Sequence, residues 1–234
     1  MTPAPKARRR DQQTAAAPAS QGRLDRDAIL SAAEQILNSD GLDAMTMRRV
    51  GADLGVDPTA IYRHFRNKEE LVIELADRAF GRVRLPAPGT DWREGLRQLN
   101  REVREIYSVH ADFAAVLVRQ ADETPNLERL TECNLRLLAE AGLTPEQAAR
   151  MQAAIVAIVA GSGLFHATIG AEAMSEPVRA HARRMYASLP PEQFPHSVAA
   201  APHLFPDPDE VGDLGVEIVI QAIERLADAG DDAR

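Results

Sequence analysis

The sequence predicts an all-α fold in two parts, a small N-terminal three-helix bundle with a helix-turn-helix and a larger C-terminal helical domain. Apolar residues recur at spacings of three and four along most of the chain, which is the period of helices that bury one face. Glycine, proline and helix-capping residues separate these stretches. The 234 residues are enough for a module of about 50 residues and a second, larger core.

The first predicted helix carries a continuous apolar stripe and ends at Gly41, because glycine commonly terminates helices. Residues three, four, seven and eight apart on a helix lie on one face, which is the face that packs into a core. The stripe consists of Ile29, Ala32, Ala33, Ile36 and Leu37.

A second short helix follows, with Met47, Val50 and Leu54 on one face. The hydroxyl of Thr46 can accept a hydrogen bond from an amide of its first turn, so Thr46 is the expected N-cap. Gly55 marks the end of this helix.

A third helix begins at Pro58, with Asp57 as its expected N-cap. Proline suits the first helical position because the amide that it lacks has no partner there. The connection to the second helix is short, so the two helices cross steeply, as in a helix-turn-helix. Ile61 and Phe65 are expected to hold the third helix against the core.

A fourth helix is predicted from a capping box in which Asn67 precedes Glu70 by three residues. Leu71, Leu75 and Ala79 continue it with a buried face.

These residues permit two interpretations. In the first, the segment is an ordinary helical bundle whose arginines only solvate its surface. The second follows from a closer match, because the segment resembles the tetracycline-repressor (TetR) family of bacterial regulators. The resemblance rests on Leu30, Ala32, Ala33 and the runs MTMRRVG at residues 45–51, LGV at 54–56 and IYRHFRNKEEL at 61–71.

The resemblance implies a DNA-binding module at residues 24–75 and a ligand-binding and dimerisation domain at 76–234. A recognition helix enters the major groove by its N-terminal residues, where Arg63 can bind guanine O6 and N7. The residues expected to meet base edges are Pro58, Thr59, Ala60 and Arg63. The resemblance adds Arg48 as a contact to a base or phosphate, and Thr46, Tyr62, His64 and Lys68 as phosphate contacts. For Tyr62, a half-buried packing role is the alternative.

Charge divides between the two parts. Residues 1–85 carry 14 Lys and Arg against 12 Asp and Glu, whereas the remainder carries 13 against 23. The formal net charge of −8 therefore resides in the C-terminal part, and DNA binding is expected to be local to the N-terminal module. A single cysteine, Cys133, excludes an intrachain disulfide and fits a reducing compartment.

Residues 1–23 contain a basic cluster and an Ala/Gln/Pro/Ser stretch without the apolar segment of a secretion signal. They are expected to form a disordered tail, with insertion of its arginines into a minor groove as the alternative. No apolar run approaches the length of about 18 residues that a membrane span needs. The sequence therefore predicts a cytoplasmic protein without a membrane partner.

Beyond Phe80, helices are predicted at 90–109, 112–121, 125–141, 145–172, 175–188 and 209–229. A proline-rich stretch, Leu189–Pro208, precedes the last helix. Its first part, LPPEQFP at 189–195, resembles the corresponding segment of the tetracycline-repressor type of C-terminal domain.

The last helix is apolar on two faces, which a helix with one face in water would not be. One face carries Val211, Leu214, Ile218, Ala222 and Leu226, and the other carries Val216, Val219, Ile220, Ile223 and Ala227. One face can pack on the helix that contains Met151–Ile158 and the other on a second subunit, so a homodimer is predicted. Burial of both faces within one subunit is the alternative.

The resemblance also implies a small-molecule effector, of unknown identity, that displaces the fourth helix. Aromatic and histidine side chains within helices give an apolar cavity a few orienting polar groups. The candidate lining residues are Trp92, Tyr107, His110, Phe113, Leu117, His166 and Ile169, with ordinary core packing as the alternative for each. No HxxxH or similar cluster accompanies them, so no metal and no cofactor are expected.

An enzyme is not expected. His110 with Asp112 and Ser162 with His166 are conceivable catalytic pairs, but no nucleophile elbow, phosphate loop or metal-ligand spacing accompanies them. The sequence predicts a ligand-responsive repressor that binds a palindromic operator as a homodimer. An activator, or a ligand-independent DNA-binding protein of the same fold, is the alternative.

Overall fold

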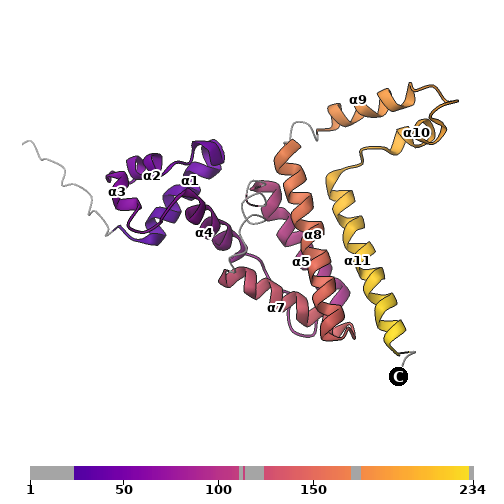
Figure 1. The fold of residues 1–234 in the computed structure, drawn as a ribbon, viewed down its shortest axis with the longest axis horizontal. Helices are drawn as coiled ribbons and strands as arrows, with labels where there is room; N and C mark the ends of the chain where they lie inside the picture. Colours follow the sequence, from indigo (N-terminus) through magenta and orange to yellow (C-terminus); the bar gives the residue numbers. More distant parts are fainter. Residues whose placement is uncertain (1–23, 111–112, 114–123, 170–174, 232–234) are drawn as a thin grey trace, which may run out of the picture.

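The computed structural model describes residues 24–110, 113, 124–169 and 175–231. The predicted tail at 1–23 and nearly all of the predicted helix at 112–121 lie outside the described residues. All regular structure in the described ranges is helical, which confirms the predicted fold class. A four-helix module stands at one end of the molecule, and a body of long helices follows it (Figure 1). Among the described helices, none is both long and apolar enough to cross a membrane.

The N-terminal helices are α1 (Arg26–Ala44), α2 (Met47–Asp53) and α3 (Pro58–Ile61). The predicted caps are present, because Thr46 accepts a hydrogen bond from the Arg49 amide at 3.1 Å and Asp57 accepts one from the Thr59 amide at 2.8 Å. Gly41 interrupts α1 with a φ of 80°, a left-handed conformation that glycine adopts without strain. The apolar stripes predicted for these helices form the core of the module.

Helix α3 is shorter than the sequence suggested. Its regular part is one turn, and the chain then continues through tight turns to Phe65. Ile61 and Phe65 are fully buried, so both anchor the segment as predicted. Helix α4 (Lys68–Phe80) begins with Asn67 as its cap, but Glu70 accepts a hydrogen bond from the amide of Arg66 at 2.7 Å. In the predicted capping box, Glu70 would accept from the amide of Asn67. In the structure it accepts from the amide one residue earlier.

The body consists of α5 (Trp92–Val109), α7 (Pro125–Glu140), α8 (Pro145–Ile169) and α11 (Pro208–Asp231), which agree with the predicted ranges. Gly95 allows α5 and α7 to approach, since a Cβ atom there would lie 2.6 Å from Leu137 Cδ2. Three ion pairs join α5 to α11, the shortest contacts of each being 2.6 Å: Arg93–Glu224, Arg97–Glu217 and Arg104–Asp213.

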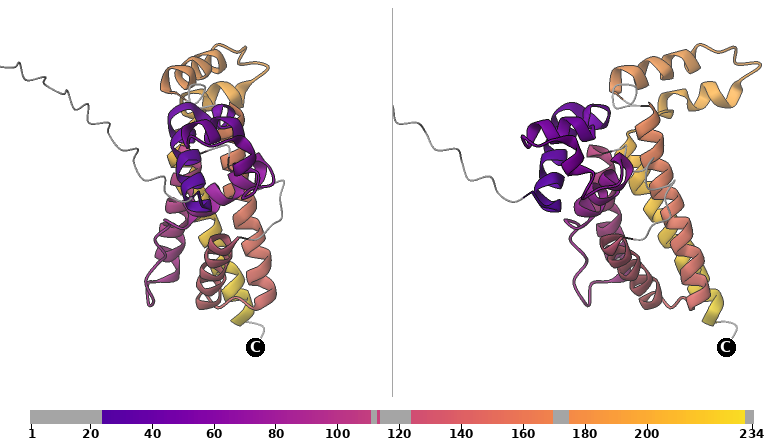
Figure 2. Two further views of the ribbon diagram at one scale, coloured as in Figure 1. Left: turned by 90° about the vertical axis from the view of Figure 1, so that its left-hand side faces the viewer. Right: turned by 60° about the vertical axis from the view of Figure 1, so that its left-hand side comes forward.

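Two further helices, α9 (Glu176–Ala187) and the short α10 (Pro195–Ala200), project from the body (Figures 1 and 2). Helix α10 and the 3-10 turn at Ala201–His203 lie in the proline-rich stretch, where the sequence predicted no helix. Neither α9 nor α10 contains a buried residue. Packing within this projection includes an edge-on contact between Tyr186 and Phe205, whose ring centroids are 5.6 Å apart.

Candidate DNA-binding face and internal cavity

The first candidate site is the solvent side of α2 and α3, on the module in Figure 1. Thr59, Tyr62 and Arg63 are exposed, and the buried Ile61 and Phe65 hold the segment from behind. Tyr62 is 54 % exposed, which is compatible with a phosphate contact and also with the half-buried packing role. Arg48 and Thr46 are also exposed, whereas Pro58, Ala60, His64 and Lys68 are partly buried.

Two arginines of this face have no carboxylate partner in the part of the chain that the structure describes. Arg49 forms ion pairs with Asp40 at 3.0 Å and Asp53 at 3.3 Å. Arg48 and Arg63, by contrast, take part in none of the ion pairs of the described residues. Their positive charges are therefore available to an anionic partner.

Thr59 is fixed at the start of α3 by two hydrogen bonds to Asp57. Its amide donates at 2.8 Å and its hydroxyl at 2.5 Å to the same carboxylate oxygen. These two bonds hold the pKa of Asp57 below its ordinary value, and the bond from the hydroxyl has the larger effect. The Thr59 hydroxyl proton is thus used within the protein, and its methyl group is the part available for a thymine methyl.

Lys68 has a structural partner. Its Nζ donates to the carbonyl of Leu42 at 2.6 Å and so joins the start of α4 to the end of α1. An ammonium has two further protons for a phosphate. The phosphate role expected for Lys68 therefore coexists with a role in positioning α4.

Arg26 positions the turn after α3, a role that no sequence pattern predicted. Its guanidinium lies 4.2 Å from the ring centroid of Phe65 and donates to the carbonyl of His64. The same group pairs with Glu70 and Glu74 of α4. Its partners are 38 to 48 residues away, beyond the reach of any local pattern.

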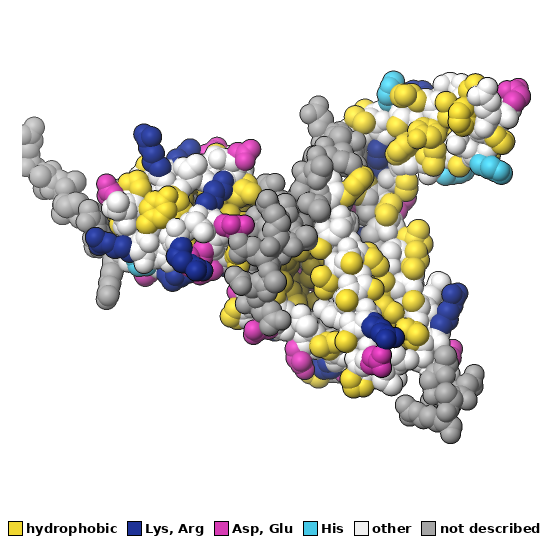
Figure 3. Space-filling view, viewed as in Figure 1, with side chains coloured by type: hydrophobic (Ala, Val, Ile, Leu, Met, Phe, Trp, Pro, Cys, Tyr) yellow, Lys and Arg dark blue, Asp and Glu magenta, His cyan; other side chains and the backbone are white. Residues whose placement is uncertain are grey.

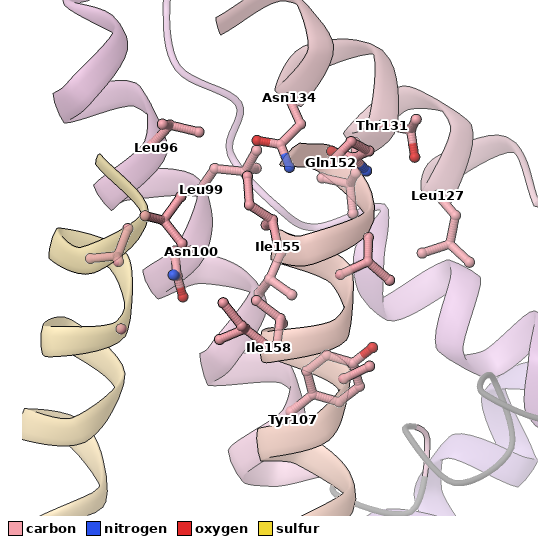
Figure 4. A pocket seen from close by; sticks show the side chains of 18 of the residues that line it. Leu96, Leu99, Asn100, Tyr107, Leu127, Thr131, Asn134, Gln152, Ile155 and Ile158 are labelled. Carbon is pink, nitrogen blue, oxygen red and sulfur yellow. The ribbon is translucent and has the colours of Figure 1, made fainter. Parts of the chain in front are cut away.

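The second candidate site is a cavity of about 140 Å³ enclosed mainly by α5, α7, α8 and α11 (Figure 4). Most of its wall is apolar, and no charged side chain of the described residues lines it. Its polar groups include three carboxamides, one each from α5, α7 and α8: Asn100, Asn134 and Gln152.

The carboxamides are not satisfied by the protein. The Oδ1 atoms of Asn100 and Asn134 and the Oε1 atom of Gln152 are buried and have no hydrogen-bond partner among the described residues. Buried polar atoms in native proteins nearly always have partners, because an unpaired one has lost its hydration without compensation. Tyr107 lines the same cavity, and burial raises the pKa of its phenol, so the hydroxyl is neutral at physiological pH.

The structure places the predicted lining residues in different surroundings. Tyr107 lines the cavity, whereas Trp92, His110 and Phe113 are not among its lining residues. Trp92 lies under the guanidinium of Arg93, and His110 packs on Phe113 with ring centroids 4.8 Å apart. Leu117 and the side chains of His166 and Ile169 lie outside the described residues.

The three carboxamides were not among the lining residues predicted from the sequence, although one signal for them was present. Asn134 lies four residues after Leu130 and three before Leu137, on the buried face of α7. A polar residue on an apolar stripe is the pattern that could have identified it.

The cavity and the DNA-facing module share helix α4. Phe80, at the end of α4, lines the cavity and packs edge-on against Tyr107, with ring centroids 5.8 Å apart. Asp77 of α4 accepts hydrogen bonds from the amide and the side-chain nitrogen of Asn126, both at 2.9 Å. Arg129 of α7 donates to the Phe80 carbonyl at 3.0 Å. Helix α7 therefore holds the end of α4 at the cavity wall.

Metal chemistry has no evident ligand set. Among the described residues, no group of three or more His, Cys, Asp or Glu side chains is placed to hold an ion. Of the lining residues that the structure describes, none is a histidine or carries a carboxylate.

Comparison with known proteins gives matches to both parts of the chain. A family model described as "Bacterial regulatory proteins, tetR family" matches residues 29–75. A second, described as "Tetracyclin repressor-like, C-terminal domain", matches residues 85–226, which is more than half of the chain.

Similar individual proteins include two bacterial repressors. The chain is 30% identical over 129 residues to the class E tetracycline repressor protein of Escherichia coli, covering 54% of this chain and 61% of that protein. It is 30% identical over 148 residues to an HTH-type transcriptional repressor of Mycobacterium tuberculosis, covering 60% and 57%. These matches thus span about three fifths of the relatives' lengths.

Among solved structures, the chain is similar to the TetR family protein ActR of Streptomyces coelicolor in complex with actinorhodin. The TM-score is 0.79 and the identity is 27%, with 88% of this chain and 99% of that chain covered. The similarity therefore extends over the DNA-facing module and the body together.

Proposed function

The chain belongs to the tetracycline-repressor (TetR) family of bacterial regulatory proteins, and on that premise we propose that it is a transcriptional repressor released from DNA by a small molecule. Proteins of this family are transcriptional regulators and not enzymes. We further propose that it binds a two-fold symmetric operator as a homodimer. The observation that carries the DNA-binding role is the exposed α2–α3 face with Arg48 and Arg63, which form no ion pair within the described residues.

On DNA, the start of α3 enters the major groove. Arg63 binds the O6 and N7 atoms of a guanine, and Thr59 and Ala60 contact thymine methyl groups. Arg48, on the neighbouring helix, contacts a base or a phosphate, while Thr46, Tyr62, His64 and Lys68 bind phosphates. The exposure of Arg48 and Arg63 supports this division, because neither charge must leave an ion-pair partner of the described ranges to reach DNA.

A dimer is supported by an apolar outer face on the body. On α11, the face with Val216, Val219, Ile220 and Ile223 is buried inside the subunit, while the opposite face is exposed. We define the outer face as Val211, Leu214, Ile218 and Leu226 of α11 together with Ile158 of α8. Leu214 and Ile218 are 60 % and 56 % exposed, which favours a second subunit as their cover.

The projecting helices add to this argument. Val178, Met185 and Phe194 are exposed apolar side chains of α9 and its connection to α10. Figure 3 shows apolar side chains on this projection and along the outer side of the body. Burial of both surfaces by a second copy of the chain would remove them from water.

Ligand responsiveness is supported by the shared position of α4. A ligand in the cavity touches Phe80, and Phe80 ends the helix that carries the DNA-facing module. A ligand that fits only one arrangement of α4 shifts the protein toward that arrangement. Repression then ends because the two α3 segments of the dimer no longer match two half-sites about one DNA turn apart.

The experiment that tests this function is selection of bound sequences from a random DNA pool, repeated with Arg63→Ala. Enrichment of a two-fold symmetric site by the wild type, with relaxed base preference in the variant, is the expected result. Enrichment of a single half-site would contradict the dimer, and no enrichment would contradict sequence-specific binding.

A further inference from the structure

The cavity described above restricts the chemistry of its ligand. We propose that it selects a compact, uncharged aromatic compound that carries at least two hydroxyl groups. This inference deepens the proposed function, because it takes the cavity to be the site of the effector. It rests on three features of the wall: its charge, its size and its unpaired carboxamides.

Charge excludes ions. No described lining residue carries a charge, and an ion buried without a counter-charge loses hydration that the wall cannot replace. A carboxylate or phosphate would need a lysine or arginine here, and an organic cation would need a carboxylate. The bound form of the ligand is therefore neutral.

Size and shape favour one aromatic ring. A volume of about 140 Å³ is close to that of apolar cavities that accept a benzene ring. The wall offers Leu99, Val103 and Ile155 as apolar contacts, with the rings of Phe80 and Tyr107 on the α4 side. Such a wall stabilises a planar, apolar frame.

The carboxamides favour hydroxyl groups on that frame over groups that only accept or only donate. Asn134 is only 8 % exposed, and its oxygen, like those of Asn100 and Gln152, lacks a donor among the described residues. Figure 4 shows Asn134 and Gln152 at one end of the cavity and Tyr107 toward the other. A hydroxyl both donates and accepts, so it satisfies a carboxamide in either of its two orientations. An ether or ketone oxygen only accepts and would leave the three oxygens unpaired.

The inference is tested with three single-ring probes of similar size: resorcinol, with two hydroxyls, m-xylene, with two methyl groups, and benzoate, with one negative charge. Dissociation constants are measured by ligand-observed NMR on the full chain, its Asn134→Leu variant and the control variant Asn38→Leu. Asn38 is exposed on α1 and far from the cavity in sequence and fold, so the control makes the same substitution without touching the wall. The ratio of resorcinol to m-xylene affinity is compared between proteins, which cancels the different hydration of the two probes.

We expect Asn134→Leu to lower that ratio about tenfold, the effect of one lost buried hydrogen bond of about 1.4 kcal/mol. The melting temperature of this variant should rise, because a buried unpaired carboxamide is replaced by an apolar group. Asn38→Leu should change neither quantity, and benzoate should bind the wild type at least tenfold more weakly than resorcinol. An unchanged ratio in Asn134→Leu, benzoate binding as tight as that of resorcinol, or no binding by any probe would each overturn the inference.

Operator release is measured separately, so the two proposals can fail independently. If resorcinol binds with the expected dependence on Asn134 but leaves operator affinity unchanged, the ligand class stands and the effector role of the cavity does not. If DNA is bound specifically while the ratio test fails, the regulator function stands and the ligand class does not.

Discussion

Replacement of Asp77 by alanine should loosen the attachment of α4 to α7. The carboxylate of Asp77 accepts both hydrogen bonds of Asn126, and the amide of Asn126 belongs to the first turn of α7. Thr124, the formal N-cap of α7, makes no capping hydrogen bond with its side chain, so Asp77 serves as the cap from another helix. Loss of an N-cap costs about 0.5–2 kcal/mol, and a hydrogen bond to a charged group contributes about 1.5–3 kcal/mol.

From these contributions we expect Asp77→Ala to lower the free energy of unfolding by about 2 kcal/mol, since the pair is partly buried. Asp27→Ala is the matched control. Asp27 pairs with Arg78 of the same helix α4 but is 83 % exposed in its side chain, so its removal should cost about 0.5 kcal/mol or less. Urea denaturation of wild type, both single variants and Asn126→Ala supplies the measurement.

The double-mutant cycle, which adds the variant with both Asp77→Ala and Asn126→Ala, isolates the bond between the two side chains, because the backbone amide of residue 126 still donates to Asp77 in Asn126→Ala. Two residues in direct contact should show a coupling energy of about 1–2 kcal/mol. Operator affinity provides the functional readout, because a loosened α4 must be ordered again when the module docks on DNA. We expect Asp77→Ala, but not Asp27→Ala, to weaken operator binding by about tenfold. A loss of stability in Asp77→Ala no larger than that in Asp27→Ala would refute the reasoning that α7 holds α4 through this pair, and a coupling energy below about 0.3 kcal/mol would refute a contribution from the side-chain bond.

Three further predictions concern DNA binding, assembly and pH. Arg63→Ala should lower specific operator affinity by about 1–3 kcal/mol and relax base preference. Lys68→Ala should instead weaken binding to all sequences, flatten the salt dependence of binding, and destabilise the fold through the lost bond to Leu42. Competition binding at several salt concentrations distinguishes the two variants. Leu214→Asp should shift the protein to monomers in analytical ultracentrifugation, and Ala139→Asp, on the exposed side of α7, should not. Burial raises the pKa of Tyr107 above its ordinary value of 10.0. The contribution of the neutral phenol to stability is therefore complete below about pH 10 and is lost as the pH rises through the folded-state pKa. Tyr107→Phe should remove that part of the decrease in unfolding free energy at alkaline pH.

The sequence was sufficient where the relevant signal was local. Apolar spacing located α1, α5, α7, α8 and α11, and the caps of α2, α3 and α4 were identified from Thr46, Asp57 and Asn67. The two faces of the last helix were also separable by spacing, and the structure buries one of them and exposes the other. Such signals are local because helix periodicity and capping involve residues within two turns.

The predictions were incomplete where partners come from distant segments. Arg26 reaches His64 and Glu74, and Asp77 reaches Asn126, over 38 to 49 residues. The short α10 was missed because prolines usually indicate a break, whereas Pro195 occupies the first helical turn, where proline is compatible with a helix. For the cavity, aromatic and histidine residues were expected to mark the wall, and the structure shows that most of the described ones pack elsewhere.

The carboxamide residues of the cavity show why a binding cavity is difficult to recognise in a sequence from its apolar residues alone. Leu137 and Leu138 are fully buried next to Asn134 on α7, so a leucine at position 134 would continue the core without interruption. An unpaired buried carboxamide costs about 1–3 kcal/mol, which the fold alone gives no reason to retain. A ligand that supplies the missing hydrogen bonds gives that reason, because its binding energy offsets the cost only when it is present. If Asn134→Leu raises stability and lowers discrimination between resorcinol and m-xylene, Asn134 is retained for recognition. If the variant lowers both stability and discrimination, Asn134 is retained for packing.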